Sequence, residues 1–163
     1  MRLKSIIQHT VGIALTVGIA ATVLAGDEKE AKITMDKVPA AVQQAVKAYA
    51  TEAEIKGIEE GDMDGTKVIE FDIVKNGKAS EIAFRPDGKL FSTEEEVALP
   101  DCPEEVQKTI AKLSKDATAG KPEKIVQEGK PSYEIVIEKG GKKVEYTISP
   151  KGKVTGKEEV GKE

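Results

Sequence analysis

The chain has 163 residues, with 25 Lys and Arg against 29 Asp and Glu, which gives a formal net charge of −4 at pH 7. This acidic balance argues against a nucleic-acid-binding role, because phosphates require a basic surface. The only His, His9, lies in a segment that we expect to be removed, which excludes Ser-His-Asp and Cys-His catalysis and His-ligated zinc. The only Cys, Cys102, leaves no partner for an intrachain disulfide.

Residues 1–25 predict a signal peptide. Arg2 and Lys4 form a basic start, and the apolar run 11–24 has the length of a signal core and is short for a membrane span. Val23-Leu24-Ala25 supplies small residues for cleavage after Ala25. We therefore expect a periplasmic or secreted protein that is free of the membrane once the signal is removed. An uncleaved N-terminal anchor is the alternative.

Residues 26–35 are charged and predict a mobile leader. A first unit then covers 36–96, with a helix capped by Asp36 and with Pro39 in its first turn. The apolar stripe of this helix is Val42, Ala45, Val46, Tyr49 and Ala53. Strands are expected at 54–59, 67–74, 79–84 and 89–93, followed by an exit at 94–96. The turns between these strands are 61–65, Asn76-Gly77 and Pro86-Asp87-Gly88.

A second unit covers 97–159, and a charged tail follows at 160–163. Its helix is capped by Asp101 or Cys102 and has Pro103 in its first turn. We interpret Cys102 as a small residue at a helix start, with a reactive or intermolecular thiol as the alternative. The helical stripe is Val106, Ile110, Leu113 and Ala117. Strands are expected at 123–127, 132–139, 142–148 and 153–155, with Gly140-Gly141 as the hairpin turn.

The two units are similar in sequence. At a fixed offset of 64, 17 of the 57 positions from Pro39 to Glu95 are identical, with no gap. The matches include turn Gly and Pro residues together with core positions, which have mechanical reasons to recur. The sequence therefore predicts an α+β fold of two tandem α-β-β-β(-β) repeats. We expect them to form one continuous antiparallel sheet with both helices packed on one face.

Short motifs in both units resemble those of the PepSY-like family, which is related in fold to the beta-lactamase-inhibitor protein. The motifs are Val38-Pro39, Pro86-Asp87-Gly88-Lys89-Leu90, Cys102-Pro103 and Pro150-Lys151-Gly152-Lys153-Val154. The resemblance covers residues 36–159 and departs from the pattern at Lys151 and Cys102. It implies an exported binding module of the kind proposed to inhibit or regulate peptidases, and it carries over no catalytic residue.

Acidic residues are predicted on the helix-free face of the sheet, and they are the candidate binding residues: Glu70, Asp72, Glu81, Glu134, Glu138 and Glu145. One interpretation is a platform for an exported protein or a basic peptide. The alternative is a solvated sheet face with cross-strand partners such as Lys75, Lys78 and Lys143. The aromatic residues Phe71, Phe84, Tyr133 and Tyr146 are expected in the core. With no Trp in the chain, association on this face should be weak and salt-sensitive.

The string Asp62-Met63-Asp64-Gly65 resembles the start of a calcium loop. Position 12 of such a loop requires an acidic ligand, and Ile73 stands there. The string therefore predicts an acidic turn, and we expect no metal and no cofactor.

These observations favour an exported, non-catalytic binding or regulatory module, either peptidase-inhibitor-like or a protein-interaction domain. Two alternatives stay open, namely an envelope structural or stress protein without a defined ligand, and a hydrolase that uses a carboxylate pair. The hydrolase is the least favoured, because the sequence has no glycine-rich phosphate loop and no nucleophile elbow.

Overall fold

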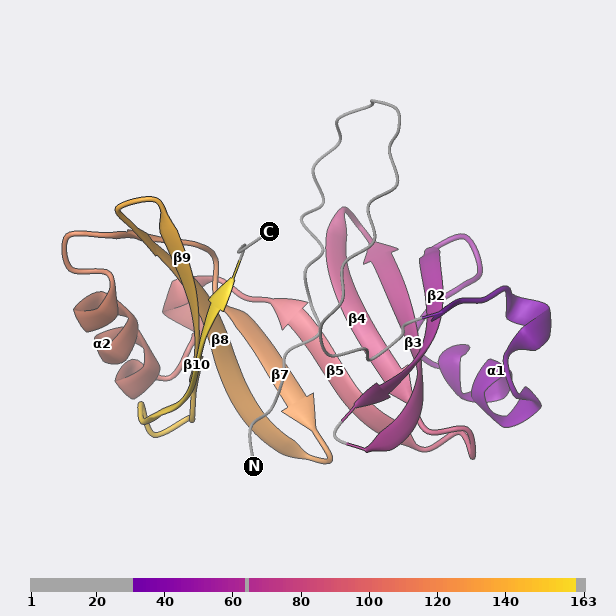
Figure 1. Ribbon diagram of the computed structural model, residues 1–163. Coiled ribbons are helices and arrows are strands. Elements are labelled where there is room, and N and C mark those ends of the chain that lie inside the picture. Colours follow the sequence, from indigo (N-terminus) through magenta and orange to yellow (C-terminus); the bar gives the residue numbers. More distant parts are fainter. Residues whose placement is uncertain (1–30, 64, 161–163) are drawn as a thin grey trace, which may run out of the picture.

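The computed structural model describes residues 31–63 and 65–160. In this part of the chain, two α-helices accompany one antiparallel sheet of ten strands, so the predicted α+β class is confirmed. The strand order is β1-β2-β3-β4-β5-β7-β8-β9-β10, and β6 pairs with β8 (Figure 1). The strands are β1 Ala31–Lys32, β2 Ile55–Met63, β3 Thr66–Lys75, β4 Lys78–Phe84, β5 Leu90–Glu96, β6 Thr118–Ala119, β7 Glu123–Gln127, β8 Lys130–Lys139, β9 Lys142–Ile148 and β10 Val154–Val160.

Both helices lie on the same face of the sheet, as expected. Directly opposed residues of an antiparallel sheet share a face. The register continues one row of opposed residues from the half with α1 to the half with α2: Ile73, Ser80, Glu95, Lys124, Tyr133 and Ile148. Nevertheless, the two helices lie at opposite ends of the molecule (Figure 1). The sheet is therefore strongly curved, with its helix-free face on the inside.

Each helix begins in the same way, and not with the predicted caps. Helix α1 (Ala40–Val46) and helix α2 (Glu104–Leu113) follow the 3-10 turns η1 (Met35–Lys37) and η2 (Leu99–Asp101). A Pro stands at each N-cap position and no side chain caps it, so the predicted caps Asp36, Asp101 and Cys102 were wrong. Proline pre-sets the backbone angle there.

A glutamine side chain fixes each helix to the turn before it. Gln43 donates to the carbonyl oxygens of Met35 and Val38 at 3.0 and 2.9 Å. Gln107 donates to those of Pro100 and Cys102 at 3.3 and 2.8 Å. These bonds satisfy carbonyl groups that a prolyl residue cannot reach, and they explain why Gln recurs at this position.

The apolar stripes of the helices close two separate cores against the sheet. Val42 and Val106 are both fully buried at equivalent positions of α1 and α2. The first core consists of Val38, Val42, Val46, Ala50, Ile69, Phe71, Ile73, Ile82 and Phe84. The second consists of Cys102, Val106, Ile110, Tyr133, Ile135, Ile137 and Ile148, with Tyr146 packed beside it. The four aromatic residues expected in the core are there.

Most elements of the second half have the same bounds as those of the first half, shifted by the same number of residues. Thr66–Lys75 corresponds to Lys130–Lys139 and Lys78–Phe84 to Lys142–Ile148. The exception is β2, whose counterpart is interrupted between β6 and β7, where the N–H of Gly120 donates to the carbonyl of Val136 at 2.8 Å.

Several strands are longer than the sequence indicated. β5 continues through Glu94–Glu96, which were predicted as an exit, and β10 continues to Val160, where a short strand and a tail were expected. Their glutamates have low strand propensity, but pairing with β7 and β9 overrides it. Ala31 and Lys32, within the expected leader, pair with β2. The expected signal peptide and its cleavage site, Asp64 and residues 161–163 lie outside the described residues.

Neither helix in residues 31–63 and 65–160 has the length and apolar character that a membrane crossing requires.

The Pro-x-Gly turns between β4 and β5 and between β9 and β10 pack against the helices. Gly88 and Gly152 have φ angles of 83° and 76°. A Cβ atom would lie 2.8 Å from the carbonyl oxygen of Ala41 at the first and 2.6 Å from that of Glu105 at the second. Thr109 of α2 also donates to the carbonyl oxygen of Gly152 at 2.7 Å. Each turn thus needs glycine for two reasons, backbone angle and close approach.

We expect Gly152→Ala to lower the free energy of unfolding by about 2–4 kcal/mol, because it adds a steric clash to the unfavourable positive φ. Gly141→Ala is the matched control, since Gly141 has the same φ of 76° but no neighbouring atom within 4 Å. Urea denaturation of both variants measures the difference. Equal losses would show that the contact with α2 contributes nothing.

Candidate functional site

The helix-free face carries acidic side chains on six neighbouring strands. The register places them in rows across β2, β3, β4, β5, β7 and β8. We call the following residues the acidic face: Glu59, Glu70, Asp72, Glu81, Glu94, Glu123 and Glu134.

Within the acidic face, carboxylates stand directly opposite one another. Glu59 is opposite Glu70 in the first half, and Glu123 is opposite Glu134 in the second. Glu81 lies between Asp72 and Glu94. Like charges directly opposed in a sheet are destabilising, by about 0.2–1 kcal/mol for each pair. The arrangement therefore costs stability.

Parts of this face are withdrawn from water, contrary to the expectation of a solvated surface. The exposed fraction is 8% for Glu59 and 2% for Glu134. One carboxylate oxygen of Glu134 accepts a hydrogen bond from the Thr147 hydroxyl at 2.9 Å. Burial of carboxylates strengthens their mutual repulsion, because the local dielectric constant is low.

The centre of the face holds a hydrogen-bonded pair of glutamates across the β5–β7 ladder. Burial, followed by the negative charges of Glu123, Glu81 and Glu134, raises the pKa of Glu94 to about 10. Burial also raises the pKa of Glu123, and its hydrogen bond with Glu94 opposes that change. Glu94 is therefore the protonated donor of this pair near neutral pH.

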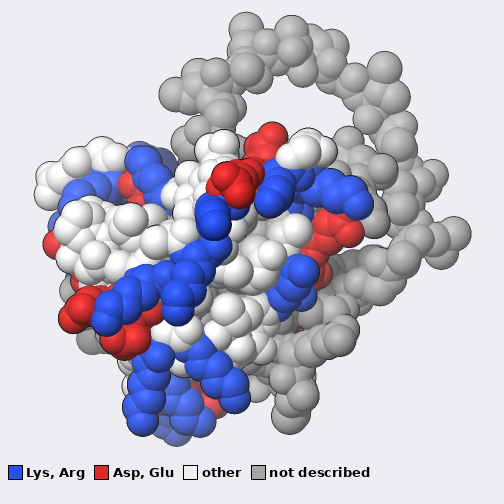
Figure 2. Space-filling view, turned by 90° about the vertical axis from the view of Figure 1, so that its left-hand side faces the viewer, with Lys and Arg blue, Asp and Glu red and all other residues white. Residues whose placement is uncertain are grey.

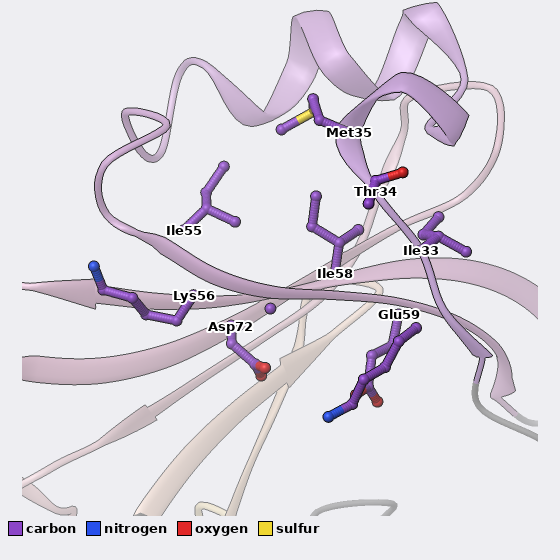
Figure 3. A pocket seen from close by; sticks show the side chains of 10 residues that line it. Ile33, Thr34, Met35, Ile55, Lys56, Ile58, Glu59 and Asp72 are labelled. Carbon is purple, nitrogen blue, oxygen red and sulfur yellow. The ribbon is translucent and has the colours of Figure 1, made fainter.

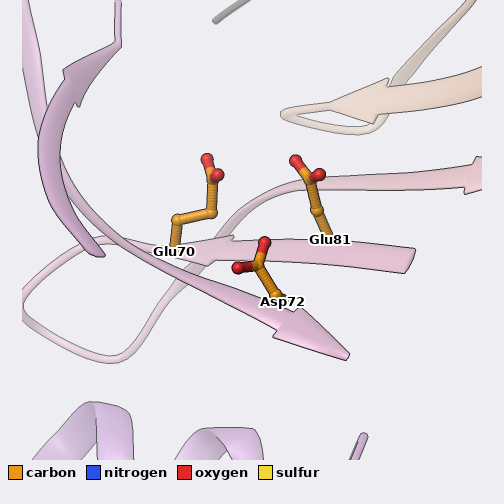
Figure 4. A group of neighbouring side chains, drawn as sticks. All are labelled: Glu70, Asp72 and Glu81. Atoms are coloured by element: carbon orange, nitrogen blue, oxygen red, sulfur yellow. The ribbon is translucent and has the colours of Figure 1, made fainter. Parts of the chain in front are cut away.

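Three carboxylates of the acidic face converge on one point. Glu70, Asp72 and Glu81 extend to the same side of β3 and β4, away from the helix (Figure 4). One oxygen atom from each lies within 4.8 Å of the others. Glycine at position 57 leaves room for Asp72, because a Cβ there would lie 2.1 Å from its Oδ2. We call Glu70, Asp72 and Glu81 the carboxylate triad.

An apolar cluster borders the acidic face in the first half. Val68, Ala83 and Phe91 are buried there, and Met63 packs against them. The guanidinium carbon of Arg85 lies 5.4 Å from the centre of the Phe91 ring. Arg85 also forms an ion pair with Glu128 of the second half. The face thus combines negative charge with an apolar margin.

A cavity of about 430 Å³ lies beside the acidic face, between β2 and the segment that leads to α1 (Figure 3). Ile55, Ile58 and Met35 line one side of it, while Glu59 and Asp72 extend to the other side of β2 (Figure 3).

Basic residues gather elsewhere. Lys67 pairs with Glu60 and Lys124 with Glu95, both on the face that carries the helices. Figure 2 shows the end of the molecule with α2, where Lys and Arg side chains form a band with Asp and Glu beside it. Charges are mixed on that outer surface, whereas the acidic face carries one sign.

The structure brings four of the predicted site residues together and separates two. Glu70, Asp72, Glu81 and Glu134 belong to the acidic face. Glu145 is opposite Glu158 towards the β10 edge, and Glu138 is exposed at the end of β8, opposite Lys143. Sequence reasoning missed three residues of the face: Glu59, Glu94 and Glu123. The 64-residue offset was the available signal, because Glu59 matches Glu123 and Glu94 matches Glu158.

Cys102 does not have the environment of a reactive thiol. It is buried in the second core, and its Sγ donates to the carbonyl oxygen of Ala98 at 3.8 Å. Burial, together with the charge of Asp101, raises the pKa of the thiol, so it is protonated at neutral pH. The α2 N-terminus does not lower the pKa, as the alternative interpretation required.

Comparison with protein-family models gives no match, and neither does comparison with curated proteins. Solved structures do match. A BLIP-like protein from Bacteroides fragilis NCTC 9343 covers 74% of this chain and 84% of its own, at 19% identity and a TM-score of 0.55. The fold is BLIP-like.

Two further structures share this BLIP-like fold. A DUF2874 family protein from Bacteroides ovatus ATCC 8483 covers 77% of this chain and 89% of its own, at 17% identity and a TM-score of 0.59. A protein from Bacteroides eggerthii DSM 20697, provisionally described as periplasmic, covers 76% and 89%, at 24% identity and a TM-score of 0.58. At these identities the likeness establishes the fold alone, and membership of the PepSY-like family stays a prediction.

The raised pKa of Glu94 makes stability depend on pH. The folded state favours the protonated carboxyl, so its contribution is complete below the ordinary value of 4.5 and is lost as the pH rises towards about 10. We expect the free energy of unfolding to fall by about 1–3 kcal/mol between about pH 5 and about pH 9. Chemical denaturation at a series of pH values measures this slope.

Glu94→Gln should flatten that slope and stabilise the protein at alkaline pH, because the amide keeps a donor without the charge. Glu95→Gln is the control, since Glu95 lies on the face with the helices. An unchanged slope in Glu94→Gln would contradict the assignment of the raised pKa to this carboxyl.

Proposed function

We propose that this protein is an exported, non-catalytic binding module whose acidic face takes a basic segment of another exported protein. The observation that carries the proposal is the set of directly opposed and partly buried carboxylates, Glu59 with Glu70 and Glu123 with Glu134. A surface that carries this electrostatic cost gains when a cationic partner neutralises it. The inner side of a curved sheet also provides the concave shape that such a partner needs.

The partner class follows from the chemistry of the face. Lysine and arginine side chains can each lie between opposed carboxylates, and arginine can do so with two parallel hydrogen bonds. The apolar margin of Val68, Ala83 and Phe91 suits the aliphatic stem of such a side chain or a neighbouring apolar residue. The basic segment therefore contains Lys or Arg next to an apolar residue.

Tandem repetition and export belong to the same proposal. The equal element bounds of the two halves support a duplicated PepSY-like unit, in which the acidic positions Glu70 and Glu134 recur together. The apolar run 11–24 and the eggerthii structure support a periplasmic or secreted location. Inhibition or regulation of a peptidase is the form of binding that the BLIP-like fold favours, and it stays a hypothesis.

The carboxylate hydrolase is the second candidate, and the Glu94–Glu123 hydrogen bond is the observation in its favour. A dyad of this kind needs a bound substrate beside it. The cavity beside the acidic face is lined by Glu59 and Asp72 and not by this pair. We therefore favour binding over hydrolysis.

A display selection of short peptides on the purified protein tests the proposal. We expect enrichment of peptides with Lys or Arg beside an apolar residue, and affinity that falls by about tenfold or more as salt rises from low to physiological concentration. Glu70→Gln/Glu81→Gln/Glu123→Gln should abolish the enrichment.

The matched control is Glu52→Gln/Glu60→Gln/Glu95→Gln, which removes the same charge from outside the acidic face. It should leave the selected peptides unchanged. Equal loss in both triple variants would reduce the effect to net charge and contradict a specific site. Recovery of no peptide above background would contradict binding altogether.

A further inference from the structure

We infer that the carboxylate triad, together with Glu59, forms a binding site for one divalent hard cation, Ca²⁺. This goes beyond the proposed partner, because the site is complete within this chain. The sequence had indicated no metal site, and its one calcium-like string, beginning at Asp62, lies at the β2–β3 turn and contributes no residue here.

The spacing of the triad suits a single ion. Oxygen ligands of one Ca²⁺ lie at about 2.3–2.6 Å from the metal, so they are no more than about 5 Å from one another. One oxygen each of Glu70, Asp72 and Glu81 meets that limit, at 4.8 Å or less. The β3–β4 ladder fixes this spacing, since Asp72 is directly opposite Glu81 and Glu70 is the next residue of β3 on the same face. Carboxylates are the ligands that hard cations prefer.

Glu59 is an independent observation that points to a cation. Only 8% of it is exposed, and it makes no hydrogen bond or ion pair with any residue in 31–63 and 65–160. It is directly opposite Glu70 and extends to the same side of β2 as Asp72 (Figure 3). A buried carboxylate without a counter-charge is costly. A divalent ion at the triad supplies that charge.

The neighbouring lysine does not supply it. Lys56 lies beside Asp72 in the cavity wall (Figure 3), but its ammonium group donates to the carbonyl oxygen of Ala53 at 2.7 Å. Gly57, which a larger residue could not replace, keeps the Asp72 carboxylate in place.

The two halves differ at this site, which predicts the stoichiometry. The 64-residue offset places Glu134 and Glu145 at the positions of Glu70 and Glu81, but Val136 at the position of Asp72. The second half therefore lacks the third carboxylate, and we expect one Ca²⁺ per chain. With few protein ligands and the rest water, the dissociation constant should be about 10⁻⁴–10⁻³ M, as in extracellular calcium modules.

Isothermal titration of CaCl₂ into the purified protein, without any peptide, tests the inference. We expect one site and a thermal stabilisation that MgCl₂ matches only weakly, because Mg²⁺ keeps its water and demands octahedral geometry. Asp72→Asn, which preserves shape, should weaken binding by about tenfold or more. Asp72→Val, which copies the second half, should abolish it.

Glu145→Gln is the matched control, because it removes the counterpart of Glu81 in the half without a triad. It should keep the affinity and the stoichiometry. Absence of binding at about 10 mM Ca²⁺, which lies well above the expected constant, would overturn the inference. So would several weak ions whose affinity falls equally in Glu145→Gln and Asp72→Asn. Neither result bears on the peptide selection, which is run without Ca²⁺.

Discussion

The pairing of β5 with β7 is the interaction on which the rest of the structure depends. It joins two four-stranded halves into one sheet over five residue pairs, from Ser92 with Gln127 to Glu96 with Glu123. Backbone bonds extend it at both ends, from Glu128 to Phe91 at 2.8 Å and from Val97 to Pro122 at 2.9 Å. Each half alone is small enough to be marginally stable. The same ladder brings Glu94 against Glu123 and so completes the acidic face.

The acidic face shows how a fold can carry a local cost. The two helix-side cores bury Phe71, Phe84, Ile135 and Ile148 almost completely, and burial of side chains of this size contributes about 1.5–3 kcal/mol each. Opposed carboxylates return a smaller amount. A surface of one sign, partly buried and next to an apolar margin, is therefore affordable in this sheet, and it becomes favourable when a cation or a basic side chain lies on it.

The BLIP-like fold by itself does not identify the activity, because one fold serves many functions. The argument for binding rests on the site, and the two proposals use different parts of it. The basic segment needs the whole face from β2 to β8, whereas the cation needs only four residues on β2, β3 and β4. Both assign the same physical role to a ligand, which is to neutralise carboxylates that the sheet register forces together.

The sequence by itself determined the fold class, most strands and the assignment of sheet faces. Alternation in β3 separated Ile69, Phe71 and Ile73 from Glu70 and Asp72, because side chains along a strand point to opposite faces. Local chemistry was also enough for the Pro-x-Gly turns, whose positive φ only glycine tolerates well.

Tertiary structure alone decided what Glu94 and Glu59 do. Glu94–Glu96 has the composition of an exit from the sheet, and only the partner strand β7 keeps it extended and buries Glu94 beside Glu123. Glu59 is one charge among many in the sequence, and its burial follows from the register of β2 with β3. Charge–charge effects of this kind depend on distances between strands far apart in sequence, which periodicity and propensity do not contain.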